Sequence, residues 1–100
     1  MTKTEQMATI AMYVSTALHE TTRDNDTIRI SYERPGTSAD LDKYIGWDSK
    51  YNHINPGDEY FVIYDETPTG YKCLLYVLNV SCDSVLTAMA ELVNLIAREF

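Results

Sequence analysis

The stretch Glu59–Val80, EYFVIYDETPTGYKCLLYVLNV, decides the fold of this chain. It contains two apolar runs, at about 59–65 and 71–80, separated by Glu66-Thr67-Pro68-Thr69-Gly70. β-Branched and aromatic residues favour strands, and five residues that include a proline and a glycine are typical of a hairpin loop. The stretch therefore predicts two antiparallel strands.

Both faces of this predicted hairpin are apolar. If Asp65 pairs with Tyr71, the alternation of side chains gives two sets. One face carries Phe61, Ile63, Cys73, Leu75 and Val77, and the other carries Tyr60, Val62, Tyr64, Leu74, Tyr76 and Leu78. Because helices cover only one face, the second needs another cover. Three alternatives are open: the segment 38–57 with Trp47 and Tyr51 as a lid, a second copy of the chain, or a different protein.

The remaining elements follow from periodicity. Apolar residues at helical spacing predict helices at about 3–20 and 84–99. In the second helix the predicted apolar stripe is Val85, Met89, Leu92 and Ile96, widened by Leu86 and Val93. Strict alternation predicts a strand at 27–33, and Ser38 could begin a short helix that Gly46 ends. The prediction is a single α+β domain over residues 1–100, with a three-stranded antiparallel sheet, two helices packed on one face, and the order α-β-(short α or loop)-β-β-α.

The charge balance excludes several kinds of partner. The chain has 100 residues, with 8 basic and 15 acidic side chains and a net charge of −7. Proteins that bind nucleic acid or anionic membranes use Lys and Arg, so we expect neither direct nucleic-acid binding nor membrane binding. The sequence shows no signal-peptide pattern and no apolar run near the ~20 residues of a membrane span. We therefore expect a cytoplasmic protein with reduced cysteines.

No catalytic or metal-binding motif is present. The histidines His19 and His53 lie in different predicted elements, and the cysteines Cys73 and Cys82 do not form a CxxC pair. Residues 40–46 begin like a calcium loop but lack its third ligand and its glycine. We therefore predict no metal, no cofactor and no enzymatic activity.

Acidic and aromatic residues concentrate on the predicted hairpin. Residues 58–83 contain one basic residue, Lys72, and five acidic residues. An acidic surface with large aromatic anchors suits a partner with a basic surface. The predicted partner-binding residues are the acids Asp58, Glu59, Asp65 and Glu66 and the aromatic residues Trp47, Tyr60, Tyr64 and Tyr76.

The composition therefore predicts a small acidic protein that binds another protein and inhibits or regulates it. A basic nucleic-acid-handling machine is a suitable target, as for phage anti-defence proteins, immunity proteins and antitoxins. The alternative is a structural or oligomerisation module that forms a homodimer through the Tyr-rich sheet face. A third possibility is a ligand binder or small enzyme with a pocket under the segment 38–57.

Overall fold

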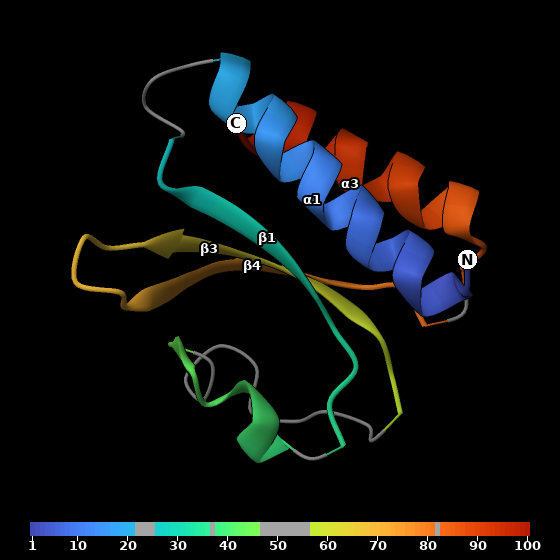
Figure 1. Ribbon diagram of the computed structural model, residues 1–100, viewed down its shortest axis with the longest axis horizontal. Helices are drawn as coiled ribbons and strands as arrows, with labels where there is room; N and C mark the ends of the chain where they lie inside the picture. Colours follow the sequence, from blue (N-terminus) through green and yellow to red (C-terminus); the bar gives the residue numbers. More distant parts are fainter. Residues whose placement is uncertain (22–25, 37, 47–56, 82) are drawn as a thin grey trace.

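Two helices and four strands make up the described part of the chain in a computed structural model, which describes residues 1–21, 26–36, 38–46, 57–81 and 83–100. Their order and bounds are α1 (Lys3–Thr21), β1 (Ile28–Glu33), the 3-10 helix η2 (Ser38–Leu41), β2 (Tyr44–Ile45), β3 (Tyr60–Glu66), β4 (Lys72–Asn79) and α3 (Val85–Glu99). Both helices lie on one face of the sheet (Figure 1). The predicted α+β class is confirmed.

The sheet has one strand more than the sequence predicted. Its order is β1-β3-β4-β2, in which β1, β3 and β4 are antiparallel neighbours, as expected. The added strand β2 pairs parallel to β4, with Tyr44 opposite Lys72 and Ile45 opposite Cys73, so the sheet is mixed. Two residues are too few to show a period of two. The predicted short helix is correspondingly reduced to η2.

The register of the hairpin differs from the assumed one. Asp65 pairs with Cys73 rather than with Tyr71, and an irregularity follows between Ile63 and Tyr64. The loop is tighter than expected because Thr67 and Tyr71 already pair, with the Thr67 N–H donating to the Tyr71 carbonyl at 2.8 Å. Gly70 supplies the positive φ, +91°, that such a short loop needs.

This register exchanges three side chains of β4 between the two faces. Tyr76 and Leu78 pack on the helix side, beside Phe61 and Ile63. Val77 packs on the other side, with the tyrosines of β3. The predicted sets for β3 are right, and those for the second half of β4 are wrong, because a shift of one residue reverses every side chain after it.

The helix-side core holds the two helices on the sheet. Its buried members are Met7, Ala11, Leu18, Ile28, Ile30, Phe61, Ile63, Val80, Ala88, Leu92 and Leu95. Thr2 and Glu5 form the capping box that begins α1, with the Glu5 N–H donating to Thr2 Oγ1 at 3.1 Å. Ser84 caps α3 by accepting from the Thr87 N–H at 3.1 Å.

A second core lies on the opposite face of the sheet. It consists of Leu41, Tyr44, Tyr60, Val62, Tyr64 and Leu74. Figure 1 shows η2 and β2 on the side of the sheet away from the helices, so this segment covers the Tyr-rich face. The first of the three alternatives is thus confirmed for residues 38–46, whereas Trp47 and Tyr51 lie outside the described residues.

The Tyr44 ring anchors this cover. It lies 5.2 Å from the Tyr64 ring, centroid to centroid, and its hydroxyl donates to Glu33 Oε1 at 2.6 Å. Lys43 Nζ approaches the same Glu33 oxygen at 2.9 Å. Burial, together with the hydrogen bond to Glu33, raises the pKa of Tyr44, so the hydroxyl stays protonated.

Neither helix of the described chain is long and apolar enough to cross a membrane.

Candidate functional site

The predicted aromatic anchors do not form one surface. Tyr60 and Tyr64 are buried in the second core, with exposed fractions of 7% and 9%, and are not exposed anchors on the sheet face. Tyr76 lies on the helix side of the sheet, where its hydroxyl donates to Glu99 Oε2 at 3.1 Å and its ring packs against Phe100. Trp47 lies outside the described residues. The assumed hairpin register placed Tyr76 on the same face as Tyr60 and Tyr64, and the irregularity between Ile63 and Tyr64 moves it to the other face.

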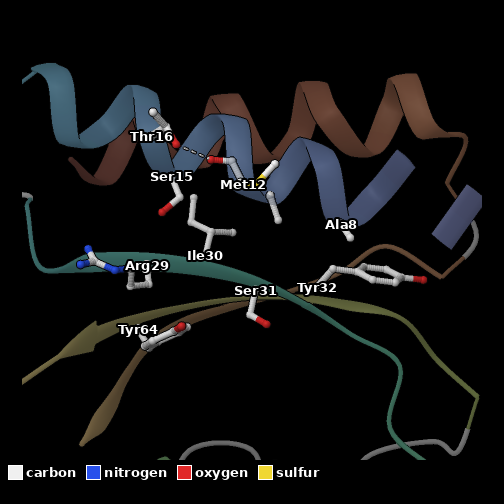
Figure 2. A pocket seen from close by; sticks show the side chains of 10 residues that line it. Ala8, Met12, Ser15, Thr16, Arg29, Ile30, Ser31, Tyr32 and Tyr64 are labelled. Atoms are coloured by element: carbon white, nitrogen blue, oxygen red, sulfur yellow. Dashed lines mark hydrogen bonds between the residues drawn. The ribbon is translucent and has the colours of Figure 1, made fainter. Parts of the chain in front are cut away.

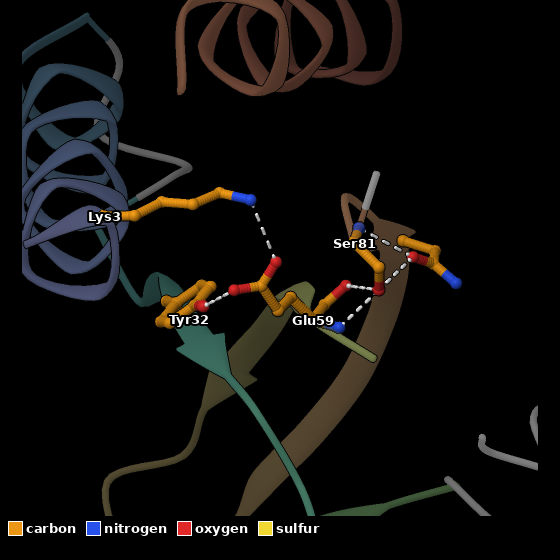
Figure 3. Close-up of polar contacts among 5 residues, drawn as sticks. Lys3, Tyr32, Glu59 and Ser81 are labelled. Atoms are coloured by element: carbon orange, nitrogen blue, oxygen red, sulfur yellow. Dashed lines mark hydrogen bonds and ion pairs between the residues drawn. The ribbon is translucent and has the colours of Figure 1, made fainter. Parts of the chain in front are cut away.

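Glu59 is the centre of a buried polar cluster rather than a surface acid (Figure 3). Its carboxylate accepts from the Tyr32 hydroxyl at 2.5 Å and pairs with Lys3 Nζ at 3.3 Å. Its backbone N–H donates to Ser81 Oγ at 2.5 Å. Burial opposes ionisation, yet the hydrogen bonds from Tyr32 and Lys3 leave the pKa of Glu59 below its ordinary value. This cluster ties α1, β1 and the start of β3 together.

The other predicted acids lie at opposite ends of β3. Asp58 precedes the strand and accepts from Asn79 Nδ2 at 3.3 Å. Asp65 and Glu66 end it, and Glu66 lies 3.7 Å from Arg29 Nε. At about 3.3 Å per residue, the two ends are roughly 20 Å apart, which exceeds the Debye length of about 8 Å in physiological salt. These acids therefore act as separate charges and not as one patch.

The surface that the sequence did not reveal is on the helix layer. Met89 was predicted to lie in the core stripe of α3, with Leu86 and Val93 widening it, but Leu86 is 71% exposed, Val93 48% and Met89 37%. The buried residues of α3 are Ala88, Leu92 and Leu95, so the prediction is confirmed for Leu92, while Val85 and Ile96 are partly buried against the core. The helix thus has two adjacent apolar stripes, and only one of them can face the sheet.

One end of the exposed stripe, at Val93, borders a groove between the two helices. Val14, Ala17 and Leu18 of α1 and Val93 and Ile96 of α3 line it, and its volume is about 190 Å³. We call this the helix-layer groove. Its lining is entirely aliphatic, so it can bind apolar side chains but holds no group for chemistry.

A second groove lies between α1 and the edge strand β1 (Figure 2). Its volume is about 350 Å³, and its lining includes Ala8, Met12 and Ser15 from α1 and Arg29 and Ile30 from β1. We call this the β1-edge groove. In contrast to the helix-layer groove, it combines apolar side chains with hydroxyls and one cation.

Groups with catalytic potential are dispersed. Among the residues that the structure describes, no three His, Cys, Asp or Glu side chains come together as a metal site. Cys73 is half-buried on β4 and the His19 ring lies against the Ile28 carbonyl, while His53 and Cys82 fall outside the described residues. The absence of enzymatic activity stays a prediction.

No protein-family model, curated protein or solved structure matches this chain.

Proposed function

We propose that the protein acts by binding another protein through the helix-layer groove and the exposed stripe of α3, and that it inhibits or regulates this partner without catalysis. The observation that carries the proposal is the exposure of Leu86, Met89 and Val93 on a helix whose core stripe is already complete. Contiguous exposed apolar side chains are a common mark of an interaction site.

The spacing of the stripe indicates how a partner would dock. Leu86, Met89 and Val93 follow the i, i+3, i+7 pattern of a helix that packs along a second helix. The helix-layer groove meets this stripe at Val93 and can take an anchoring side chain of an amphipathic helix. The partner surface is thus an apolar helix or an apolar ridge.

Charge favours a partner that is basic around this ridge. The net charge is −7, and Glu20 on α1, three residues after Ala17 of the groove lining, is exposed. Complementary charge mainly accelerates association. Nucleic-acid-handling proteins carry such basic surfaces, and we retain one of them as the proposed target class.

The test is a pull-down with the tagged chain from lysate of its native setting, at low and high salt, with two charge variants. Val93→Glu places a carboxylate in the groove and should reduce capture of a stoichiometric partner at least tenfold. Tyr71→Glu, at the hairpin loop and 63% exposed, lines neither groove, so it is the matched control and should leave capture unchanged. Equal capture by both variants would contradict the proposal.

The molecular mass of the free chain separates this function from the oligomerisation alternative. A monomer at micromolar concentration leaves the helix-layer groove free for a foreign partner. A dimer that Val93→Glu dissociates and Tyr71→Glu does not would assign the same surface to a second copy. A dimer through the Tyr-rich face would require the cover formed by η2 and β2 to move away.

A further inference from the structure

The edge strand β1 presents unpaired main-chain groups to the β1-edge groove. The Thr27 carbonyl accepts from the Glu66 N–H at 3.0 Å, which makes Thr27 and Glu66 a hydrogen-bonded pair. Antiparallel pairs alternate, so the main-chain groups of Ile28, Ile30 and Tyr32 point away from β3. The geometry at Ile28 agrees, because Arg29 Nη1 donates to its carbonyl at 3.2 Å from outside the sheet.

Because the Ile28 carbonyl already accepts from Arg29, the part of the β1 edge that can pair with a ligand begins after Ile28. The outward N–H and C=O groups of Ile30 and Tyr32 have no hydrogen-bond partner within the described ranges of the chain. An extended peptide laid along β1 would pair with these groups and continue the antiparallel ladder.

The wall of the groove contains a polar group that lacks a partner. Ser15 is 93% buried, since its exposed fraction is 7%, yet its hydroxyl forms no hydrogen bond with any residue that the structure describes. Figure 2 shows this hydroxyl directed from α1 towards β1 and into the groove. A buried hydroxyl without a partner is unfavourable, so a ligand that hydrogen-bonds to Ser15 regains that energy. Ala8, about two helical turns before Ser15 on the same wall of the groove, is small and leaves room for a ligand side chain.

Charge selects the kind of peptide. Arg29 is the one charged residue in the lining of the β1-edge groove, and no acidic side chain lines it. Its Nε lies 3.7 Å from Glu66 Oε2 and its Nη1 donates to the Asp26 and Ile28 carbonyls, so Nη2 is the group that can meet a ligand carboxylate. A peptide residue that pairs with Arg29 across the new ladder has its side chain on the same face, within reach of the guanidinium. A carboxylate at that position complements the site, and a lysine or arginine is repelled.

The position of α1 argues against a second copy as the occupant. α1 packs on β1, so a second β1 in the same sheet would bring its own α1 to the same side (Figure 1). Neighbouring strands lie about 4.8 Å apart, whereas packed helices need 8–10 Å. A bare peptide segment has no helix to collide with α1.

We propose that the β1-edge groove binds an extended acidic peptide segment of a partner protein by strand addition to β1, with a carboxylate at Arg29 and a hydrogen-bonding side chain at Ser15. This site is separate from the helix-layer groove and does not depend on the function assigned there.

The test selects displayed random heptapeptides on the full chain and, in parallel, on two variants. Met12→Glu adds a carboxylate to the groove wall. Tyr13→Glu makes the same change one residue along the helix, outside the groove lining and at a similar exposure, 69% against 61% for Met12. Thermal melting confirms that both variants are folded.

The expected result is a set of peptides enriched in Asp or Glu on the wild type and on Tyr13→Glu. The strongest of them, labelled for fluorescence anisotropy, should bind Met12→Glu at least tenfold more weakly. It should also slow hydrogen exchange of the Ile30 and Tyr32 amides at least tenfold. The proposal is overturned if no peptide is enriched, if the enriched peptides are basic, if Met12→Glu binds equally well, or if these amides exchange at unchanged rates.

Discussion

Truncating Leu41 should show how much the cover over the Tyr-rich face contributes to the free energy of unfolding. Leu41 has no exposed surface and packs in the second core with Tyr44 and Leu74. Leu→Ala in a core costs about 2–5 kcal/mol, and the lower half applies where the surroundings can collapse. The cover is a short segment at the surface, so we expect about 2–3 kcal/mol for Leu41→Ala. For a domain of this size that corresponds to a fall in Tm of roughly 10–20 °C.

The assay is urea and thermal denaturation followed by far-ultraviolet circular dichroism. Leu86→Ala is the matched control, because it removes the same atoms from a side chain that is 71% exposed. Its effect should stay within about 0.5 kcal/mol, as for other surface substitutions. If Leu41→Ala and Leu86→Ala had equal effects, the packing of η2 and β2 on the sheet would be refuted as a source of stability. Leu41→Ala should also increase dye binding, because it loosens the cover over the tyrosines.

Three further predictions concern hydrogen bonds. Burial and the hydrogen bond to Glu59 raise the pKa of Tyr32 to about 12 from its ordinary 10.0. The protonated Tyr32 hydroxyl therefore contributes fully to the free energy of unfolding below about pH 10, and this contribution is lost as the pH rises towards 12. Tyr32→Phe should therefore reduce the alkaline loss of stability measured by urea titration. Tyr44→Phe removes a hydrogen bond to the Glu33 carboxylate and should cost about 1.5–3 kcal/mol at neutral pH in the same assay. Ser84→Ala removes the cap of α3 and should cost about 1 kcal/mol, whereas Ser84→Asp should preserve most of it.

Each of these predictions has a result that contradicts it. If the stability of Tyr32→Phe fell with rising pH as steeply as that of the wild type, ionisation of Tyr32 would not be the cause of the alkaline loss of stability. Stability of Tyr44→Phe equal to the wild type would show that the hydroxyl contributes nothing where it lies. Equal effects of Ser84→Ala and Ser84→Asp would mean that the cap is not what begins α3.

At acidic pH the relevant group is Glu59. Its pKa is lowered in the folded protein, so its contribution is present above the pKa of the unfolded chain and is lost as the pH falls through the folded value. Glu59→Gln keeps the shape of the side chain and should flatten stability over that acidic range. An unchanged acid profile in this variant would show that other carboxylates control acid unfolding.

The residue types of the predicted binding site can be read from the sequence, but the surroundings of each residue in the folded protein cannot. Glu59 and Tyr60 are neighbours in the chain, yet one ends in an ion pair with α1 and the other in the second core. Helical periodicity predicts that the exposed stripe of α3 is part of the core, because the period shows that the apolar residues share one side of the helix but not how wide the buried part of that side is. Which part of the arc is covered depends on the angle at which the helix meets the sheet, and that angle is a property of the whole fold.

Alternation and helical periodicity by themselves determined the two helices, the three antiparallel strands and the α+β class, because these patterns are local and repeat over several residues. Tertiary structure alone decided three other features: the short parallel strand β2, the hairpin register and the cover of the Tyr-rich face. Each depends on which distant residues meet. Two residues of strand, or a shift of one residue in pairing, leave no periodic mark in a sequence, yet they determine which side chains face the solvent. The surfaces available for function are therefore set by packing, and the local pattern only supplies the side chains from which they are made.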